Sequence, residues 1–240
     1  MTQAKVRLYV EQALAVGQPV ALAEGQANYL FNVMRLGPGD AVLLFNGRDG
    51  EWRARVVEAG KRRGALRCEG LTAALRLPPD LWLLVAPIKR DRMQFVVEKA
   101  VELGVARILP VQTRFTNERI RLDKLQAHAL EAAEQCGATF VPEVAELVAL
   151  ERVLAAWPVE RRLLWCDEAL AGQAVALGGV RGARWAILIG PEGGFAPEEQ
   201  VRLRAMAQVV ALSLGPRILR ADTAAVAALT LWQATLGDWV

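Results

Sequence analysis

Short runs of hydrophobic residues, several of them alternating with polar residues, follow one another through roughly the first 70 positions. Such runs, separated by turn signals, are typical of β-strands. They predict strands at residues 5–10, 40–47, 51–60 and 64–71. Asn46-Gly47 and the basic segment 61–63 predict turns, and residues 26–36 predict one short helix. The first part of the chain is therefore expected to form a small β-barrel with one helix.

After Pro79 the pattern changes to unbroken apolar runs that alternate with segments of helical spacing. The apolar runs predict buried strands at residues 81–88, 106–112, 161–168, 184–190 and 209–215. The helical spacing predicts helices at residues 91–104, 122–137, 197–207 and 221–238. This alternation indicates an α/β domain whose mostly parallel sheet is covered on both faces. The prolines at 78 and 79 interrupt regular structure, which predicts two domains, residues 1–72 and residues 73–240.

Composition narrows the class of protein. The 240 residues are 53% hydrophobic and 23% charged, as in a soluble globular protein. The N-terminus lacks the apolar core of a signal peptide, and no apolar run reaches the ~18 residues that span a bilayer. The cysteines Cys68, Cys136 and Cys166 are odd in number and far apart, which fits neither a disulfide framework nor a zinc site. We therefore expect a cytoplasmic protein with no membrane partner and no metal.

Two residue types used by hydrolases and metalloenzymes are almost absent. His128 is the only histidine and Ser213 the only serine in the chain. His128 lies in a predicted helix and Ser213 in a predicted strand, so the pair is a poor candidate for a hydrolytic triad. A single histidine also excludes a metal centre built from several histidines.

The excess of positive charge lies in the first third of the chain. Residues 1–76 hold 11 Lys and Arg against 7 Asp and Glu, a balance of +4, and the remaining 18 bases and 19 acids give −1. A polyanionic partner of the N-terminal part fits this distribution.

Three consecutive predicted strands end in polar or glycine-bearing loops at residues 166–172, 190–199 and 215–223. Ligands of parallel α/β sheets bind beyond the carboxyl ends of strands, so a ligand site is expected there. The glycines of "GPEGGF" at 190–195 let a ligand approach the backbone, but they also suit a tight turn. Their spacing matches neither the dinucleotide fingerprint nor a P-loop, which disfavours ordinary Rossmann and nucleoside triphosphatase sites.

The same loops carry a specific pair of motifs. The first is "AILIGPEGGFAPEE" at 186–199, and the second is "LSLGPRILRADTAAVAAL" at 212–229. Agreement extends over nearly the whole chain, through "RLYV", "VMRLGPGD", "IKRDRMQFVVEKAVELGV" and "EAAEQCGATFVPEV". On these residues the chain resembles the SPOUT methyltransferases, and within them the bacterial family that methylates uridine N3 in small-subunit (16S) ribosomal RNA.

The resemblance implies an α/β fold in two parts. Residues 1–72 are expected to form a PUA-like RNA-binding β-barrel, and residues 73–240 a SPOUT methyltransferase domain with a parallel sheet and a deep C-terminal trefoil knot. It further implies S-adenosylmethionine as the cofactor, a homodimer through the knotted domain, and ribosomal RNA or the small ribosomal subunit as the partner. The alternatives are methylation of another rRNA or tRNA nucleotide, or a non-catalytic RNA-binding protein. The intact glycine-bearing motifs argue against the last.

Cofactor contacts are expected from the two motif loops. Backbone groups of Gly190 and Gly215 can hydrogen-bond the adenine and ribose, and neighbouring apolar side chains offer a wall to the ring. The same glycines also suit simple turns. The expected set is Ile189, Gly190, Gly193, Gly194, Leu214, Gly215, Ile218, Leu219, Thr223 and Ala224.

Two residues are expected to act on the uracil ring. Arg220 stands just beyond the second loop, where a positive charge favours the anion formed when N3 loses its proton. Its guanidinium cannot be the base. Glu192 is a candidate proton acceptor, and the alternative is that it only complements a helix dipole.

Four basic residues in family-like segments are candidate RNA contacts, with an ordinary solvated charge as the alternative for each. They are Arg7, Arg35, Lys89 and Arg92. The chain departs from the family pattern at Ala138-Thr139, where a basic pair is usual, and at Asn28-Tyr29, where histidine is common.

Overall fold

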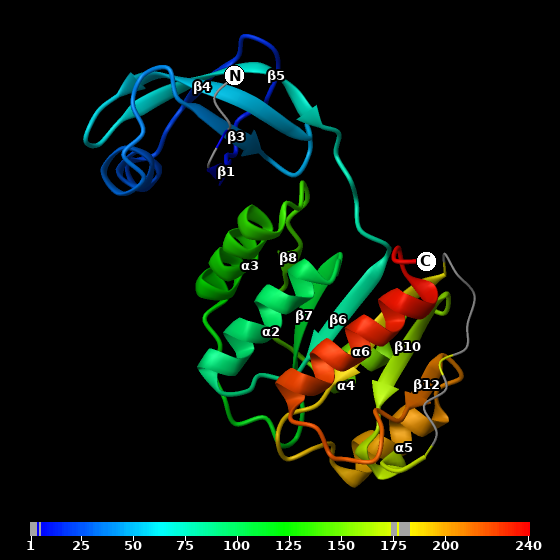
Figure 1. The fold of residues 1–240 in the computed structure, drawn as a ribbon. Coiled ribbons are helices and arrows are strands. Elements are labelled where there is room, and N and C mark those ends of the chain that lie inside the picture. The colour runs from blue at the N-terminus through cyan, green and yellow to red at the C-terminus, as the bar shows by residue number, and fades with distance from the viewer. Residues whose placement is uncertain (1–3, 5, 174–176, 178–182) are drawn as a thin grey trace. The chain divides into compact units, whose positions relative to one another are not determined.

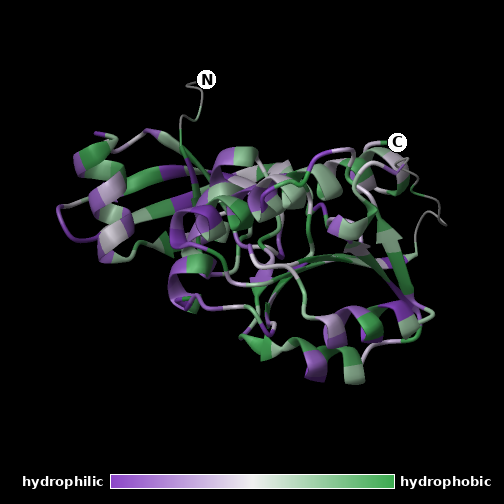
Figure 2. Cartoon of the chain, turned by 90° about the horizontal axis from the view of Figure 1, so that it is seen from below, coloured by the Kyte–Doolittle hydropathy of each residue, from purple (hydrophilic) through white to green (hydrophobic). Residues whose placement is uncertain are grey.

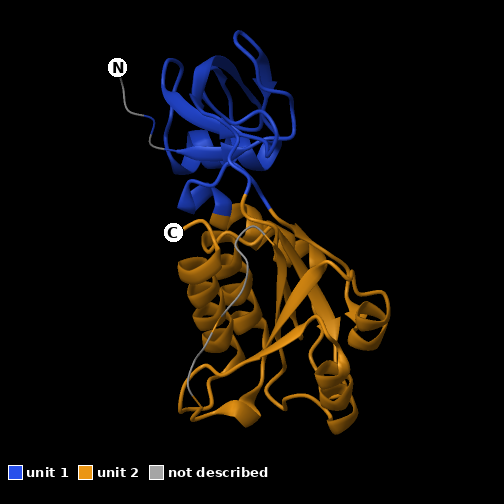
Figure 3. Ribbon diagram, turned by 90° about the vertical axis from the view of Figure 1, so that its right-hand side faces the viewer, with its two compact units in different colours: residues 1–77, 133–141 blue, residues 78–132, 142–240 orange. Residues whose placement is uncertain are grey.

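The computed structural model describes residue 4, residues 6–173, residue 177 and residues 183–240 (Figure 1). The chain divides into two compact units (Figure 3). Unit 1 comprises Met1–Leu77 with Ala133–Val141, and unit 2 comprises Pro78–Ala132 with Pro142–Val240. The roles assigned above to residues 1–72 and 73–240 stay predictions.

Unit 1 is built on a five-stranded sheet in the order β1-β3-β4-β5-β2. Its strands are β1 (Arg7–Tyr9), β2 (Pro19–Ala21), β3 (Ala41–Phe45), β4 (Glu51–Ala59) and β5 (Gly64–Ala73). β1 pairs with β3 in parallel, and the other neighbours pair antiparallel. The predicted turns after β3 and β4 are confirmed. The sequence did not predict β2, a three-residue edge strand that begins with a proline.

The predicted helix of unit 1 is confirmed, but most of it is a π-helix. The α-helix α1 (Glu24–Ala27) continues directly into the π-helix η1 (Asn28–Val33). Leu30 is fully buried in the core of unit 1. Phe31 packs against Gly64 at the start of β5, where an added Cβ would lie 2.3 Å from the ring. Glycine at position 64 therefore lets the helix lie close to the hairpin.

Arg7 holds residues 133–141 within unit 1. Its Nε donates to the Glu51 carboxylate at 2.6 Å, and its two Nη atoms donate to carbonyl oxygens 2.7–2.9 Å away. Those oxygens belong to Ala133, Glu134 and Ala138. The carbonyls at the end of helix α3 (Leu122–Cys136) thus find a cationic partner, as helix C-termini require.

Unit 2 contains a parallel sheet in the order β12-β10-β11-β6-β7-β8, with β9 also paired to β7. Its strands are β6 (Leu81–Val85), β7 (Arg107–Gln112), β8 (Glu143–Val144), β9 (Val148–Ala149), β10 (Arg161–Cys166), β11 (Arg184–Ile189) and β12 (Val209–Leu212). The five apolar runs of the sequence form β6, β7, β10, β11 and β12, as predicted. Two-residue strands such as β8 and β9 are too short to show a period, and they were not predicted.

Helices cover both faces of this sheet (Figure 3). They are α2 (Arg90–Glu102), α3, α4 (Leu150–Ala155), α5 (Pro197–Ala205) and α6 (Ala221–Leu236). α2 packs on α6, which packs on β11, whereas α4 contacts β7 and α5 contacts β12. Figure 2 shows mainly hydrophobic strands and helices striped with both colours, as expected for a parallel sheet buried on both faces.

The expected two-part fold, with an N-terminal β-sheet unit and an α/β unit, is confirmed. The trefoil knot stays a prediction. None of the helices among the described residues has the length and apolar character needed to cross a membrane.

Candidate active site

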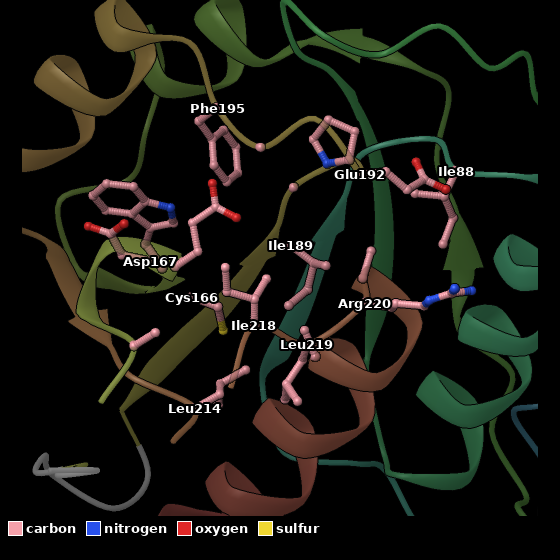
Figure 4. A pocket seen from close by; sticks show the side chains of 18 of the residues that line it. Ile88, Cys166, Asp167, Ile189, Glu192, Phe195, Leu214, Ile218, Leu219 and Arg220 are labelled. Carbon is pink, nitrogen blue, oxygen red and sulfur yellow. The ribbon is translucent and has the colours of Figure 1, made fainter. Parts of the chain in front are cut away.

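A cavity of about 530 Å³ lies beyond the carboxyl ends of β6, β10, β11 and β12 (Figure 4). These four strands are neighbours in the sheet, so the loops that follow them meet. The predicted convergence of residues 166–172, 190–199 and 215–223 is confirmed, and residues 88–92 after β6 add a fourth wall. The volume lies in the ~300–1,000 Å³ range of small-molecule sites.

The loop after β11 needs its glycines for packing. A Cβ on Gly190 would lie 2.7 Å from Cε2 of Phe195, and one on Gly194 would lie 2.7 Å from Oε1 of Glu168. Gly194 also has a φ of +69°, which side chains rarely adopt. Phe195 and Glu168 therefore occupy the cavity wall because positions 190 and 194 carry no side chain.

The loop after β12 is fixed by backbone hydrogen bonds and by Ser213, the only serine in the sequence. Gly215 has a φ of +100°, and its carbonyl accepts a hydrogen bond from Gly172 N at 3.1 Å. The Ser213 hydroxyl accepts a bond from Gly215 N at 3.3 Å and donates to Gln173 O at 3.2 Å. Ser213 thus joins two loops, which gives this buried serine a structural role.

The loop after β10 supplies lining residues that sequence reasoning missed. Asp167 is buried and engaged, because its carboxylate accepts bonds from Ala169 N and from Arg204, both at 3.0 Å. Burial raises the pKa of the Cys166 thiol to about 12. Glu168 is exposed on the cavity wall and has no hydrogen-bond or ion-pair partner among the described residues, which is also true of Glu192 in the loop after β11.

Aromatic side chains close one side of the cavity. Trp165 and Phe195 both line it, and their rings meet edge to face with centroids 6.0 Å apart. Both are buried, at 1% and 9% exposure. The polar loop at 166–172 and the motif phenylalanine were visible in the sequence, but only the fold brings them together.

Charged groups gather at another side of the cavity. Figure 4 shows Glu192 and Arg220 on the side of Ile88, opposite Asp167 and Phe195. Arg92 at the start of α2 forms an ion pair with Asp222 in the first turn of α6. Arg220 is exposed at the N-cap of α6 and has no side-chain partner in the part of the chain that the structure describes. Its guanidinium is thus available to a ligand.

Most of the expected site residues line this one cavity. They are Lys89, Arg92, Ile189, Gly190, Glu192, Gly194, Leu214, Gly215, Ile218, Leu219, Arg220 and Ala224. Gly193 and Thr223 do not line it: an added Cβ on Gly193 would lie 3.2 Å from Phe115, and the Thr223 side chain is exposed. Arg7 and Arg35 belong to unit 1, where Arg7 is occupied by the contacts described above and Arg35 is exposed.

The comparisons with known proteins agree with one another. A family model described as an RNA methyltransferase domain matches residues 76–233, and one described as an RNA methyltransferase PUA domain matches residues 22–67. The ribosomal RNA small subunit methyltransferase E of Rickettsia conorii is 29% identical over 228 residues, which cover 93% of each chain. The protein of that name from Bacillus subtilis is 26% identical, covering 85% of this chain and 86% of its own.

Solved structures give the same result. A crystal structure of ribosomal RNA small subunit methyltransferase E from Neisseria gonorrhoeae, bound to S-adenosyl methionine, superimposes with a TM-score of 0.88. It is 30% identical to this chain, and the match covers 98% of this chain and 99% of the other.

Proposed function

Because the chain belongs to the RNA methyltransferase family whose domain model matches residues 76–233, we propose that it methylates N3 of a uridine in small-subunit (16S) ribosomal RNA. The expected enzyme class, an S-adenosylmethionine-dependent rRNA methyltransferase, is confirmed. The atom N3 and the uridine are the proposed part. The observation that carries the proposal is the convergence of "GPEGGF" and "GPRILR" on one cavity.

The residues of the cavity fit S-adenosylmethionine. Ile189, Leu214 and Leu219 give an apolar wall for a purine ring, and the glycine backbones of both loops give hydrogen-bonding groups beside it. When bound, this cofactor supplies the methyl group carried on its sulfonium.

Glu168 complements the positive charge of that cofactor. Its carboxylate lines the cavity without a partner among the described residues, whereas Asp167 beside it is already engaged. We assign Glu168 to the ammonium group of the cofactor's amino acid portion, because a carboxylate and an ammonium form a charge-assisted hydrogen bond.

Arg220 and Glu192 act on the uracil. N3 of uracil carries a proton, so methylation requires that the ring anion be favoured. The unpaired guanidinium of Arg220 at the cavity rim favours that anion by its charge. Glu192, on the same side of the cavity in Figure 4, is the candidate that accepts the proton. A positioned base of this kind typically contributes ~10²–10⁴ in rate.

Two protein-level expectations belong to the same proposal. We place RNA binding mainly in unit 1, with Lys89 and Arg92 of unit 2 contacting phosphates near the cavity, and we expect a homodimer formed through unit 2. The positive balance of residues 1–76 supports the first assignment. Cytoplasmic location also stays a prediction.

Primer extension on ribosomal RNA tests the proposed atom. N3 is a donor of the Watson–Crick edge, so its methylation blocks pairing and stops reverse transcriptase. RNA from cells that lack this protein should lose one uridine stop, and cells that carry the Arg220→Ala variant should lose it as well. A stop pattern unchanged in both strains contradicts the proposal, and loss of a ribose or non-uridine modification would favour the alternative substrate.

A further inference from the structure

One turn of the helix in unit 1 exposes an unusual set of side chains. Tyr29, Val33 and Met34 are 37%, 61% and 36% exposed although all three are large and hydrophobic. Met34 N donates to Tyr29 O at 2.9 Å, the five-residue bond of a π-helix, so these side chains lie about one turn apart on one side. π-Helical turns of this kind occur frequently at functional sites.

Arg35, directly after this turn, adopts a conformation that arginine rarely has. Its φ is 56°, and it is the only non-glycine residue with positive φ among the described residues. Helices commonly end in this left-handed conformation, usually at glycine, because a Cβ is unfavourable there. The side chain is exposed and has no partner in the described part of the chain. Glycine would adopt this backbone conformation with a smaller conformational penalty than arginine. The presence of arginine here therefore indicates a role for its guanidinium.

A basic turn lies beside the same helix. Phe31 of η1 packs on Gly64, and the turn Lys61–Arg63 immediately precedes that glycine. The side chains of Arg62 and Arg63 are each 85% exposed, and their contacts with Glu24 and Glu58 are both 3.5 Å long. Such solvent-exposed pairs are weak, so these cations remain available to a stronger anion.

We propose that these residues form one RNA-binding surface, the Tyr29 face, made of Tyr29, Val33, Met34, Arg35 and the turn 61–63. An unpaired base stacks on the Tyr29 ring, with Val33 and Met34 beside it, while Arg35 and the basic turn contact the flanking phosphates. Aromatic rings stack with any base, and exposed aromatic residues among cations are how proteins hold single-stranded RNA. This proposal rests on RNA being the substrate, and it adds the part of unit 1 that holds it.

Positive φ at Arg35 permits a test in which misfolding is not a concern. Arg35→Gly removes the guanidinium and also relieves the backbone, so folding is not weakened. Tyr29→Ala removes the ring and Tyr29→Trp keeps an aromatic platform. Val16→Ala changes another exposed hydrophobic residue of unit 1, outside the face and 74% exposed. All four are made in the full chain, and affinity for an unstructured oligoribonucleotide is measured by fluorescence anisotropy over a series of salt concentrations.

Tyr29→Ala is expected to weaken binding on the order of tenfold, and Tyr29→Trp to restore it. Arg35→Gly should lower the slope of log affinity against log salt by about 0.7, the value for one phosphate contact on a single strand. Val16→Ala and the affinity for S-adenosylmethionine should not change.

Unchanged RNA affinity and salt slope in both Tyr29→Ala and Arg35→Gly overturn the proposal and leave a protein partner as the occupant of this face. The assay reads RNA binding without methylation. A wild-type enzyme that binds RNA but methylates no uridine therefore refutes the proposed function and not the Tyr29 face.

Discussion

The cavity of unit 2 and the Tyr29 face of unit 1 differ in how they are built. Four loops, which follow four neighbouring strands, meet to form the cavity, and its walls include buried side chains such as Phe195 and Ile189. The face is formed by one helical turn and one hairpin turn, and its side chains are exposed. A concave site suits a small molecule of fixed shape, whereas a convex exposed face suits a flexible polymer.

The difference predicts two kinds of response to mutation. In the cavity the shape of the backbone matters, because a Cβ added at a glycine moves a neighbouring wall. On the face the contacts are made by exposed side chains, so each single substitution should remove one contact and give a modest loss. Arg220 belongs to neither kind, because it stands at the rim and is expected to act on the reacting base.

The largest effect is expected at this rim. Arg220→Ala should lower the single-turnover methylation rate by roughly 10²–10³ and leave cofactor affinity nearly intact, because the stabilising charge matters only as N3 loses its proton. Arg220→Lys should recover part of the rate, since an ammonium lacks the planar fork of the guanidinium. The loss should shrink as pH rises, because more uridine ionises without help.

The methylation rates of both variants can be measured by quenched flow from neutral to alkaline pH. Calorimetry measures their affinity for the cofactor. A fall in cofactor affinity as large as the fall in rate would assign Arg220 to the cofactor site.

A smaller but clear effect is expected from the cavity wall. A Cβ added by Gly190→Ala would lie 2.7 Å from Phe195, which must then move. Overpacking of this kind costs about 1–3 kcal/mol of folding stability. Because the displaced Phe195 ring lines the cavity, its movement changes the shape that the cofactor meets, and cofactor affinity should fall on the order of tenfold. Gly70→Ala is the matched control, because nothing lies within 4 Å of its added carbon. Titration calorimetry measures the cofactor affinity of both variants. Equal affinities would show that Phe195 moves without affecting the cofactor site.

Removal of one charge should have a selective effect. Glu168→Gln is expected to weaken S-adenosylmethionine and S-adenosylhomocysteine by on the order of tenfold each, since both carry the ammonium group. Methylthioadenosine lacks the amino acid portion, and its affinity should not change. Competition binding with the three ligands separates the groups: loss for S-adenosylmethionine alone would place Glu168 at the sulfonium, and equal loss for all three would place it at the ribose.

The smallest effect concerns the thiols. Because burial raises the pKa of Cys166 to about 12, its thiol stays protonated and unreactive in the folded protein at about pH 8. Cys136 is exposed. Iodoacetamide should therefore label Cys136 and spare Cys166, as peptide mass spectrometry can show. Cys166 is partly exposed and lines the cavity, so its rapid labelling would contradict the raised pKa.

Much of the fold follows from local pattern. The apolar runs predicted β6, β7, β10, β11 and β12, and helical spacing predicted α2, α3, α5 and α6, because each pattern needs only neighbouring residues. Elements of two to six residues, such as β2, β8, β9 and α4, are too short to show a period, so contacts elsewhere in the chain stabilise them. The π-helical form of residues 28–33 could not be predicted either, because the sequence pattern indicates only that a helix forms there.

The sequence by itself determined the class of the protein and the two loops at its cavity, because "GPEGGF" and "GPRILR" are contiguous motifs. Only the tertiary structure decided what stands opposite them. The strand order places Glu168 against Gly194. The fold also places Arg7 at the end of α3, although the sequence alone shows Arg7 only as one more positive charge. Which loops meet depends on pairing between strands that are distant in the sequence. Whether an arginine is free or engaged depends on partners more than a hundred positions away, so neither property can be predicted from a local stretch of residues.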